Sequence, residues 1–326
     1  MRSFLLHRAW EIEVAPPGPA SQGIAYSSRP SHGQPLRLAF QVQRSLDHKS
    51  NKATITLYNL SARRSAWIER GFTVTLRVGY GTRQLTTNDQ IFLGQVVERT
   101  TVMEGPDSAT RMECGDAEAL LQQAHVSVSY YKTSVAEVLN EVVRQLQNVS
   151  LLGVSEMRGS ALSNIRNPSL TRYSDAGPAV RVLDALLTKR GFDWSFQNGK
   201  LVVSHPCGQQ QAIATVLSPA TGLLERPSVS KKGVAFRALI QPALTPPGVV
   251  QLRSGVTECN GNFRVCQANF MGDSYGQEWL VEGYGEAYTT VNAPFVPPSD
   301  QGGDAMPAAV PAEADGPEMD EEGVLP

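Results

Sequence analysis

The sequence has no long hydrophobic run, few cysteines and no clear catalytic motif. None of its apolar stretches approaches the ~18 residues of a membrane-spanning helix. The N-terminal stretch MRSFLLHRAWEIEV holds one arginine and then three apolar residues before His7, which is too short for the apolar core of a signal peptide. We therefore expect a protein that is made and used without Sec export.

Cysteine is scarce, with 4 residues at positions 114, 207, 259 and 266. No two of them form a C-x-x-C pair, and a chain of 326 residues is large enough to bury a core without disulfides. Free buried thiols are the interpretation we favour. Cys259 and Cys266 could still meet across a hairpin, so the state of the cysteines stays open here.

The residues that usually carry catalysis are scattered. The 5 histidines lie in separate segments, whereas zinc needs about four ligands. There is no phosphate-binding loop and no G-x-G-x-x-G. GDSYG at 272–276 resembles the nucleophile motif of some esterases, but no histidine follows His205 to serve as its base. We interpret GDSYG as a turn and predict no catalytic residue, metal, cofactor or small-molecule substrate.

Basic residues are absent from the last part of the chain. From Val265 onward there are 12 acidic residues and no basic one, so the part through Arg264 carries 29 − (31 − 12) = +10. Two interpretations remain: a solvated acidic tail on an ordinary domain, or a basic surface that faces an anionic partner or its own tail. SARRSAWIER at 61–70 places three arginines around Trp67, but no motif places a helix in a nucleic-acid groove, and we favour a polar loop with a short helix.

The first third of the chain has the period of β-strands. In KATITLYNLS, Ala53, Ile55 and Leu57 alternate with Thr54 and Thr56, which predicts a strand with one buried face. LRLAFQV and FTVTLRVGYG alternate in the same way, and glycines separate these runs. Short strands with such turns predict a sandwich or small barrel over 1–125.

Two details within this region predict local structure. QIFLGQVVERTTV carries Gly94, which indicates a bulge or the close approach of another backbone. GDAEALLQQA follows as a short predicted helix, with Asp116 as its N-cap.

Residues 126–205 change to a helical period. TSVAEVLNEVVRQLQ places valines and leucines on one face, and Ser134 with Glu137 forms a capping box. A second helix is predicted from Pro178 to Arg190, with a C-cap glycine after it. FDWSFQNGKLVVSH then predicts a hairpin with a type I′ turn at Asn-Gly. We predict a small α/β module between two β regions.

Strands dominate again from 206 to 291. GVAFRALI and VVQLRSG flank the turn TPPG, and GNFRVCQANF and QEWLVEGY form a predicted final pair. Residues 292–326 are rich in proline, alanine, glycine and acid, a composition typical of disorder unless a partner orders the segment.

The order of these segments resembles the hub proteins of contractile phage baseplates. ITLYNLS, VTLRVGYG, IFLGQVV and RMECGDAEALL follow one another as in those families, and TGLLERPSV, LIQPALTPPGVVQL and GDSYGQEW agree later in the chain. The resemblance covers roughly 35–285 and rests on order and spacing. The motif positions it marks as structural or interface residues are Asn59, Leu60, Ser61, Gly79, Tyr80, Phe92, Gly94, Asp116, Gly222, Gly272, Asp273, Gly276 and Trp279.

The resemblance extends to the hub part of the type VI secretion spike. It implies how the chain is divided into domains and how copies of the chain assemble. It implies two tail-tube-like β-barrel domains, at 1–125 and 206–291, with the helix-and-hairpin module at 126–205 and an acidic tail at 292–326. Three copies would present six barrels to a sixfold tube. The expected partners are the chain itself as a homotrimer, the central spike protein and the tail tube protein, with tape-measure and other baseplate proteins possible, and DNA only as passing cargo.

The resemblance also implies a non-enzymatic role in the virion after synthesis in the host cytoplasm. The hub would link the tube to the spike around a channel. One alternative is a distal-tail or tube-terminating protein, which would have one barrel or sixfold symmetry. An alternative of another class is a peptidoglycan hydrolase of the tail tip, because paired carboxylates are recognised by distance and not by sequence.

Overall fold

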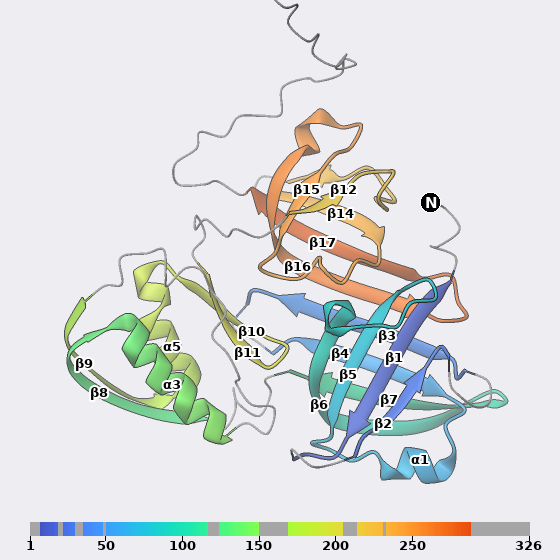
Figure 1. Cartoon of the computed structure of the whole chain (residues 1–326), viewed down its shortest axis with the longest axis horizontal. Helices are drawn as coiled ribbons and strands as arrows, with labels where there is room; N and C mark the ends of the chain where they lie inside the picture. Colours follow the sequence, from blue (N-terminus) through green and yellow to red (C-terminus); the bar gives the residue numbers. More distant parts are fainter. Residues whose placement is uncertain are drawn as a thin grey trace, which may run out of the picture.

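The computed structural model of the chain describes residues 7–18, 22–29, 35–47, 50–116, 124–149, 169–204, 214–230 and 233–287. They form a large curved β-sheet and, beside it, a smaller unit of helices and β-ribbons (Figure 1). Each part has its own cluster of buried apolar side chains. The protein is mainly β with an α/β insertion, as we predicted. The predicted helix after Asp116 and the acidic tail lie outside the described residues.

The N-terminal β region forms from alternating sequences. Its strands are β1 (Arg8–Ala15), β2 (Ile24–Ser27), β3 (Leu38–Ser45), β4 (Lys52–Tyr58), β5 (Thr73–Tyr80), β6 (Gln90–Glu104) and β7 (Asp107–Gly115), with the short helices α1 (Ala62–Trp67) and η2 (Thr87–Asp89) between them. In β4, Ala53, Ile55 and Leu57 are buried, which confirms the predicted strand. We did not predict β1, although Trp10 and Ile12 alternate there with glutamates.

Gly94 allows a close approach between β6 and β7, as we expected. A Cβ at this position would lie 2.6 Å from the carbonyl oxygen of Gly115 and would also overlap the ring of Phe92. The register between β6 and β7 shifts between Val96 and Glu98. Both observations agree with a bulged strand that twists strongly.

The helical module is built around a core of its own. Its elements are β8 (His125–Ser134), α3 (Val135–Val149), β9 (Ser169–Pro178), α5 (Ala179–Leu186), η3 (Thr188–Arg190), β10 (Asp193–Gln197) and β11 (Lys200–Ser204). The capping box is confirmed: the Glu137 N–H donates to Ser134 Oγ at 3.3 Å, and the Ser134 N–H donates to Glu137 Oε2 at 2.9 Å. The hairpin turn is confirmed by positive φ at Asn198 and Gly199. The β8–β9 ribbon was not predicted.

The C-terminal β region contains β12 (Thr215–Leu217), β13 (Ser228–Val229), β14 (Gly233–Leu239), β15 (Val249–Leu252), η4 (Thr257–Cys259), β16 (Gly261–Asp273) and β17 (Trp279–Ala287). The predicted final pair is confirmed, because β16 and β17 are antiparallel neighbours. β14 pairs with β17, and β15 pairs with β16. Cys114, Cys259 and Cys266 are free thiols, which agrees with our interpretation, and Cys207 lies outside the described residues.

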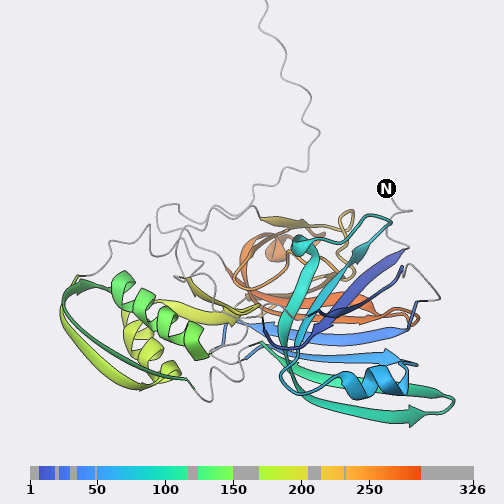
Figure 2. The same ribbon diagram turned by 60° about the horizontal axis from the view of Figure 1, so that its bottom comes forward.

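The two β regions share one sheet and one core. β16 pairs with β3 from Gln267↔Ser45 to Asp273↔Ala39, so the strands run in the order β13-β14-β17-β16-β3-β4-β7-β6-β5-β1-β2. The larger apolar cluster includes side chains from both regions, and Figure 2 shows the strands of both regions stacked side by side. Among the described residues this path does not close on itself, so the two separate barrels stay a prediction.

Candidate assembly site

One face of this sheet is polar and open over the eight strands from β13 to β6. In β3 and β4 the side chains of Phe40 and Ile55 point into the core, whereas Gln41 and Thr54 lie opposite each other on the other face. We call this surface the open face. Its central members are Arg237 and Leu239 (β14), Leu280, Glu282 and Tyr284 (β17), Gln267, Asn269 and Met271 (β16), Ala39, Gln41 and Gln43 (β3), Lys52, Thr54, Thr56 and Tyr58 (β4), Arg111 and Glu113 (β7), and Glu98, Thr100, Val102 and Glu104 (β6).

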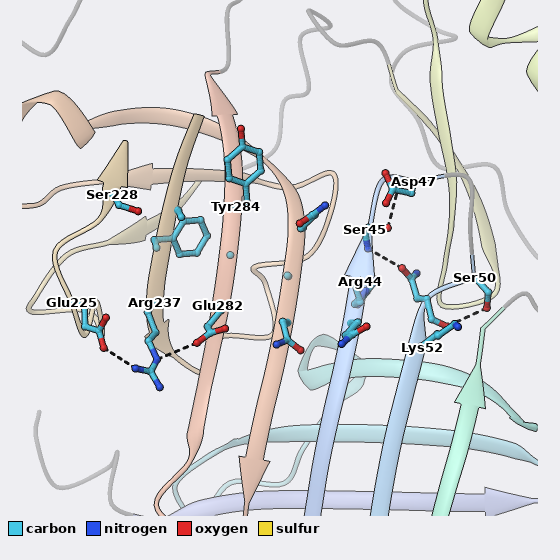
Figure 3. Close-up of a pocket in the computed structure, with 18 of the residues that line it drawn as sticks. Arg44, Ser45, Asp47, Ser50, Lys52, Glu225, Ser228, Arg237, Glu282 and Tyr284 are labelled. Atoms are coloured by element: carbon cyan, nitrogen blue, oxygen red, sulfur yellow. Dashed lines mark hydrogen bonds and ion pairs between the residues drawn. The ribbon is translucent and has the colours of Figure 1, made fainter. Parts of the chain in front are cut away.

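The open face is hollowed in two places. A cavity of about 740 Å³ lies over β14, β17, β16 and β3, with a rim of loop residues that includes Glu225 and Asp47 (Figure 3). Arg237 lies between two acids there, 2.7 Å from Glu225 and 3.4 Å from Glu282. A second cavity of about 450 Å³ lies over β4, β7 and β6. The face is therefore concave along the run of strands.

The first end of the open face is the distal half of β6. β5 pairs with β6 only as far as Gln95, and beyond Val96 no strand in the described part of the chain pairs with the outer side of β6. β6 and β7 are joined by Gly105 and Pro106, with φ +64° at Gly105, as in a two-residue type II′ turn. Because hydrogen-bonded positions alternate along an antiparallel pair, we infer that every second residue from Arg99 to Met103 directs its N–H and C=O outward.

The second end is the segment 222–229, which runs along the outer side of β14 and ends in the short strand β13. The Leu224 N–H donates to the Arg237 carbonyl at 2.9 Å, and the Leu239 N–H donates to the Gly222 carbonyl at 2.8 Å. Exposed large apolar side chains gather at the two ends. Among the described residues, 4 of the 7 such side chains lie there, namely Val102, Met103, Leu224 and Val229.

The two β regions are fastened together around Trp279. Its ring packs edge-on against Phe40 with centroids 5.3 Å apart, and the Arg8 guanidinium lies 5.5 Å from its centre, within cation–π range. The Tyr80 hydroxyl accepts from the Ile240 N–H at 3.1 Å and donates to the Trp279 carbonyl at 3.4 Å. Burial raises the pKa of Tyr80 to about 12, so the phenol stays protonated and keeps this donor.

The GDSYG turn belongs to the same cluster. β16 ends at Asp273 and β17 begins at Trp279, which confirms the predicted turn. The Asp273 carboxylate accepts from Arg37 Nε at 3.1 Å and Nη2 at 2.6 Å, and Arg8 donates to the backbone carbonyls of Asp273 and Gly276. Burial opposes ionisation of Asp273, but the hydrogen bonds from Arg37 and two backbone N–H groups hold its pKa below the ordinary value. The turn therefore binds Arg8 and Arg37 and joins the C-terminal β region to the N-terminal one.

The structure brings five of the motif positions into this one cluster: Tyr80, Gly272, Asp273, Gly276 and Trp279. Gly272 is required by packing, since a Cβ there would lie 2.5 Å from Phe40 Cζ and 2.8 Å from Trp279 Cε3. Sequence reasoning missed Arg8, which supplies three donors to this turn. Its only sequence signal was a lone arginine at the start of an alternating run.

The Asn-Leu-Ser motif lies elsewhere and shapes the end of β4. Asn59 has φ +59°, its Oδ1 accepts from the Ser108 N–H at 3.1 Å, and its Nδ2 donates to Asp107 at 2.8 Å. Leu60 is buried, and Ser61 caps α1 by accepting from the Arg64 N–H. These three residues turn the chain from β4 into α1.

The other motif positions are also local. Phe92 is buried and Gly94 makes room for it. A Cβ at Gly79 would lie 3.2 Å from Leu85 Cδ2, and Gly222 has φ +112° beside Leu239. Each of these residues acts through packing or backbone shape at its own position. Asp116 belongs to a separate network.

That network is a buried polar latch between the helical module and the sheet. Among the described residues, 7 of the 11 buried polar or charged side chains lie at this boundary: Arg44, Asn51, Asp116, Ser195, Gln197, Ser204 and Arg264. Gln197 Oε1 accepts from Arg44 Nε at 3.1 Å and Nη2 at 2.9 Å, and from Asn51 Nδ2 at 3.2 Å. Nearby, Arg264 donates to Asp193 at 2.7 Å and to Ser204 at 2.6 Å.

Asp116 anchors this latch from the body side. Its carboxylate accepts from the Asn51 backbone N–H at 2.9 Å and from Asn51 Nδ2 at 2.7 Å. Burial raises the pKa of Asp116 to about 6, against the hydrogen bonds from Asn51 and Asn198 and the charge of Arg44, which favour the ionised form. Burial likewise lowers the pKa of Arg44 to about 10. Both groups are therefore charged at neutral pH, and their partners fix how the module sits on the sheet.

No group of three or more histidine, cysteine, aspartate or glutamate side chains in the described ranges could hold a metal ion. No helix in these ranges is long and apolar enough to cross a membrane. The arrangement can position strand edges and a concave polar surface.

Comparisons with known proteins agree with an assembly role. A family model described as "Baseplate hub gp41" matches residues 24–285, whereas no curated protein matches by sequence. A tail protein from Neisseria meningitidis MC58 has a similar structure, with a TM-score of 0.57 at 9% identity over 86% of this chain and 96% of that one. The 43 kDa tail protein of prophage MuSo2 from Shewanella oneidensis gives a TM-score of 0.54 at 10% identity, over 85% of this chain and 98% of that one.

A further similar structure comes from a secretion system. An E. coli component of the type VI secretion system, described as structurally similar to the T4 bacteriophage tail proteins gp27 and gp5, gives a TM-score of 0.52 at 10% identity, over 79% of this chain and 76% of that one. At these identities the likeness establishes the fold. The family match spans most of the chain and confirms the resemblance drawn from the sequence. The chain belongs to the baseplate hub gp41 family.

Proposed function

We propose that three copies of this chain form a ring that links the tail tube to the central spike around a channel lined by the open face. Membership of the hub family makes the chain a structural component of a phage tail. The observation that carries the proposal is the state of the open face, which is continuous across both β regions and ends in two partly apolar edges. Its first edge is β6 at Arg99–Met103, and its second is the segment 222–229.

The two edges differ, so contact between copies would be head to tail. Such heterologous contacts close into rings when the rotation between copies allows it. An exposed strand edge is a template for pairing with another chain, and the apolar side chains at both ends would be buried in the contact. Val102, Met103, Leu224 and Val229 are exposed in the monomer. Their exposure costs free energy in an isolated monomer, and their burial between copies would favour the assembly.

The number of strands supports a channel that is wide enough for a helical protein. The open face spans eight strands from β13 to β6, so three copies would supply 3 × 8 = 24. At ~4.8 Å between strands the ring would measure ~115 Å around and ~37 Å across at the backbone. Side chains of ~5 Å on each side, half the spacing of packed sheets, leave ~27 Å. This exceeds the ~10–12 Å diameter of an α-helix, so a helical tape-measure protein could pass.

The remaining parts of the proposal follow the family. We infer that the two β regions act as two tube-like domains, at 1–125 and 206–291, and that the module at 126–205 is fixed outside them by the latch. The motif residues around Trp279 would keep the two domains in one wall. We infer no catalytic role, and no observation on the described residues favours the hydrolase alternative. The type VI secretion component among the similar structures supports a spike as the partner.

The test is the oligomeric state of the purified protein. We expect native mass spectrometry to give a trimer, alone or with its spike. Met103→Pro should prevent the trimer, because proline removes a backbone donor from the outer edge of β6, while far-ultraviolet circular dichroism should show an unchanged monomer. Tyr275→Ala, an equally exposed position at the GDSYG turn, is the matched control and should trimerise. A stable hexamer would favour the tube-terminating alternative.

A further inference from the structure

Four exposed arginines gather at the helix α1 and on the strand next to it. Arg63 and Arg64 lie on α1, Arg70 follows this helix, and Arg99 lies on β6. The helix and the strand are in contact, because Arg99 Nη1 donates to Ser65 Oγ of α1 at 3.3 Å. We call these four arginines the α1 patch.

The α1 patch lies on the side of the sheet opposite the open face. Ser65 Oγ of α1 lies 2.8 Å from Thr101 Oγ1, and Thr101 is on the face of β6 opposite the residues that line the second cavity. The Gly71 N–H, next to Arg70, donates to the Val96 carbonyl of β6 at 2.8 Å. The patch therefore follows the reverse side of β6.

No carboxylate in the described part of the chain forms an ion pair with the α1 patch. Ion pairs are found there for eight other arginines. The segment 61–72 holds one acid, Glu69, so the patch and this residue together carry 4 − 1 = +3. Guanidinium groups bind carboxylates through paired, charge-assisted hydrogen bonds. The patch therefore fits a partner segment that is rich in carboxylates.

The same chain supplies such a segment after β17. This strand ends at Ala287, and the residues from Asp300 to Glu322 include 8 acidic residues and no basic one. Of these acids, 6 lie between Glu313 and Glu322. The acidic tail at 292–326 is therefore complementary in charge to the α1 patch.

The acidic tail is long enough to reach the α1 patch of its own chain. β17 and β6 are five strands apart in the sheet, which corresponds to ~24 Å. The register aligns Glu282 of β17 with Gln95 of β6, so Ala287 and Thr101 lie about ten residues apart along the strands, or ~33 Å. The separation is then ~40 Å, whereas 313 − 287 = 26 residues lead from Ala287 to Glu313 and span ~25–31 Å as a flexible coil or ~85 Å when extended.

We propose that the acidic tail binds the α1 patch of its own chain. The tether gives the tail an effective concentration of about millimolar at the patch, so a weak contact is enough to hold it. Ion pairs at an exposed surface contribute little and are screened by salt, so the docked tail adds little to the stability of the fold. The contact itself does not require a ring. In the ring of the proposed function it would place the tail on the outer surface, within reach of other baseplate proteins.

The test is photo-cross-linking from the patch in the full chain. p-Benzoylphenylalanine replaces Ala66, an exposed residue of α1, and the cross-linked peptides are identified by mass spectrometry after irradiation. At 50 mM salt we expect cross-links to residues 300–326 in a product that runs as a single chain on a denaturing gel. Their yield should fall by about 10-fold at 500 mM salt, because salt screens exposed charges.

A charge-reversal variant and its matched control test the role of the arginines. The patch variant is Arg63→Glu/Arg64→Glu/Arg70→Glu, and its yield at 50 mM salt should fall by about 10-fold or more, since about three ion pairs are lost. The control makes the same change in charge at three exposed cations of the helical module, Lys132→Glu/Arg172→Glu/Lys189→Glu, and should keep the yield of the wild type. Far-ultraviolet circular dichroism should show both variants folded.

A rescue variant reverses the tail as well. Adding Glu318→Arg/Asp320→Arg/Glu321→Arg to the patch variant should restore the cross-links, because the signs of both partners are then exchanged.

The outcomes separate this proposal from the ring. No cross-link to 300–326 in the wild type at 50 mM salt, an equal loss in the patch variant and the control, or a rescue variant without cross-links would overturn the docking of the tail. Cross-linked dimers in place of single chains would overturn docking on the same chain. Native mass spectrometry of each sample reads the oligomeric state independently, so a monomer with the expected cross-links would support the docked tail and count against the ring.

Discussion

Asn51 is the residue whose removal should test the latch most directly. Its Nδ2 donates to Asp116 at 2.7 Å, to the Phe196 carbonyl at 2.8 Å and to Gln197 at 3.2 Å, and its Oδ1 accepts from the Ser45 N–H at 2.9 Å. Asn51→Ala removes all four hydrogen bonds from a site that is closed to water. It leaves the Asp116 carboxylate with fewer donors.

The expected loss of stability follows from the buried polar groups that lose their hydrogen-bond partner. A hydrogen bond to a charged group contributes about 1.5–3 kcal/mol, and a buried group without its partner costs about 1–3 kcal/mol. We expect Asn51→Ala to lower the free energy of unfolding by about 3–5 kcal/mol at pH 7.5. Asn269→Ala on the open face, whose side chain makes one weak contact, should stay within about 0.5 kcal/mol.

The loss of stability should also depend on pH, in a direction set by the pKa of Asp116. The pKa of Asp116 in the folded protein, about 6, lies above its ordinary value of 3.8, so its protonation favours the folded state. This contribution is complete below about pH 3.8 and is lost as the pH rises through 6. Asn51→Ala removes donors that favour the ionised form and so raises the pKa of Asp116 further. The variant should be less destabilised at pH 5 than at pH 7.5.

The assay is urea denaturation at both pH values, with the double variant Asn51→Ala/Asp116→Asn alongside. The double variant carries no buried charge at position 116, so the difference between its losses at the two pH values should shrink. An equal loss for Asn51→Ala at pH 5 and 7.5, or a loss below about 1 kcal/mol, would refute the argument that a buried carboxylate holds the module in place.

Three further predictions concern the wall and the tail. Gly272→Ala should lower the free energy of unfolding by about 1–3 kcal/mol through overpacking, whereas Gly255→Ala, which has nothing within 4 Å of its Cβ direction, should be neutral by the same denaturation assay. Tyr80→Phe should cost about 1–3 kcal/mol, because it leaves a buried backbone N–H without its acceptor, and an unchanged midpoint would refute that role. Deleting 293–326 removes no described residue and should leave the melting temperature and trimer unchanged while weakening attachment in a baseplate assembly assay.

Local structure was predictable where one short stretch determines it. The alternation of Ala53, Ile55 and Leu57 identified β4, and Asn198-Gly199 identified the hairpin turn, because both signals depend on neighbouring residues. The capping box of Ser134 and Glu137 is also local. Each of these predictions needed only the period of an element or the preferred φ of one residue.

Contacts between distant segments were not predictable in this way. The pairing of β16 with β3 joins residues more than 200 positions apart. The sequence of neither strand indicates which strand it pairs with. Gln197 looked like an ordinary hairpin residue, and its role appears only when Arg44 and Asn51 reach it. The GDSYG turn was correctly identified, but not the arginines it holds. The open face could be expected as a polar side of each strand, but its continuity over eight strands depends on the register.

The chemistry of the two boundaries suggests different mechanical roles. The boundary between the β regions contains one shared apolar core, with Trp279 and Phe40 at its edge, and the arginine contacts to the GDSYG turn lie at its rim. Apolar burial contributes most of the stability of such a contact. The latch to the module is polar and charged, and buried ion pairs and hydrogen bonds add little net stability but are very costly when half broken. In the proposed ring, a wall built the first way would resist a change in diameter. A module attached the second way has one strongly preferred orientation and a small net binding energy, so a partner that supplies alternative hydrogen bonds could release it without disturbing the wall.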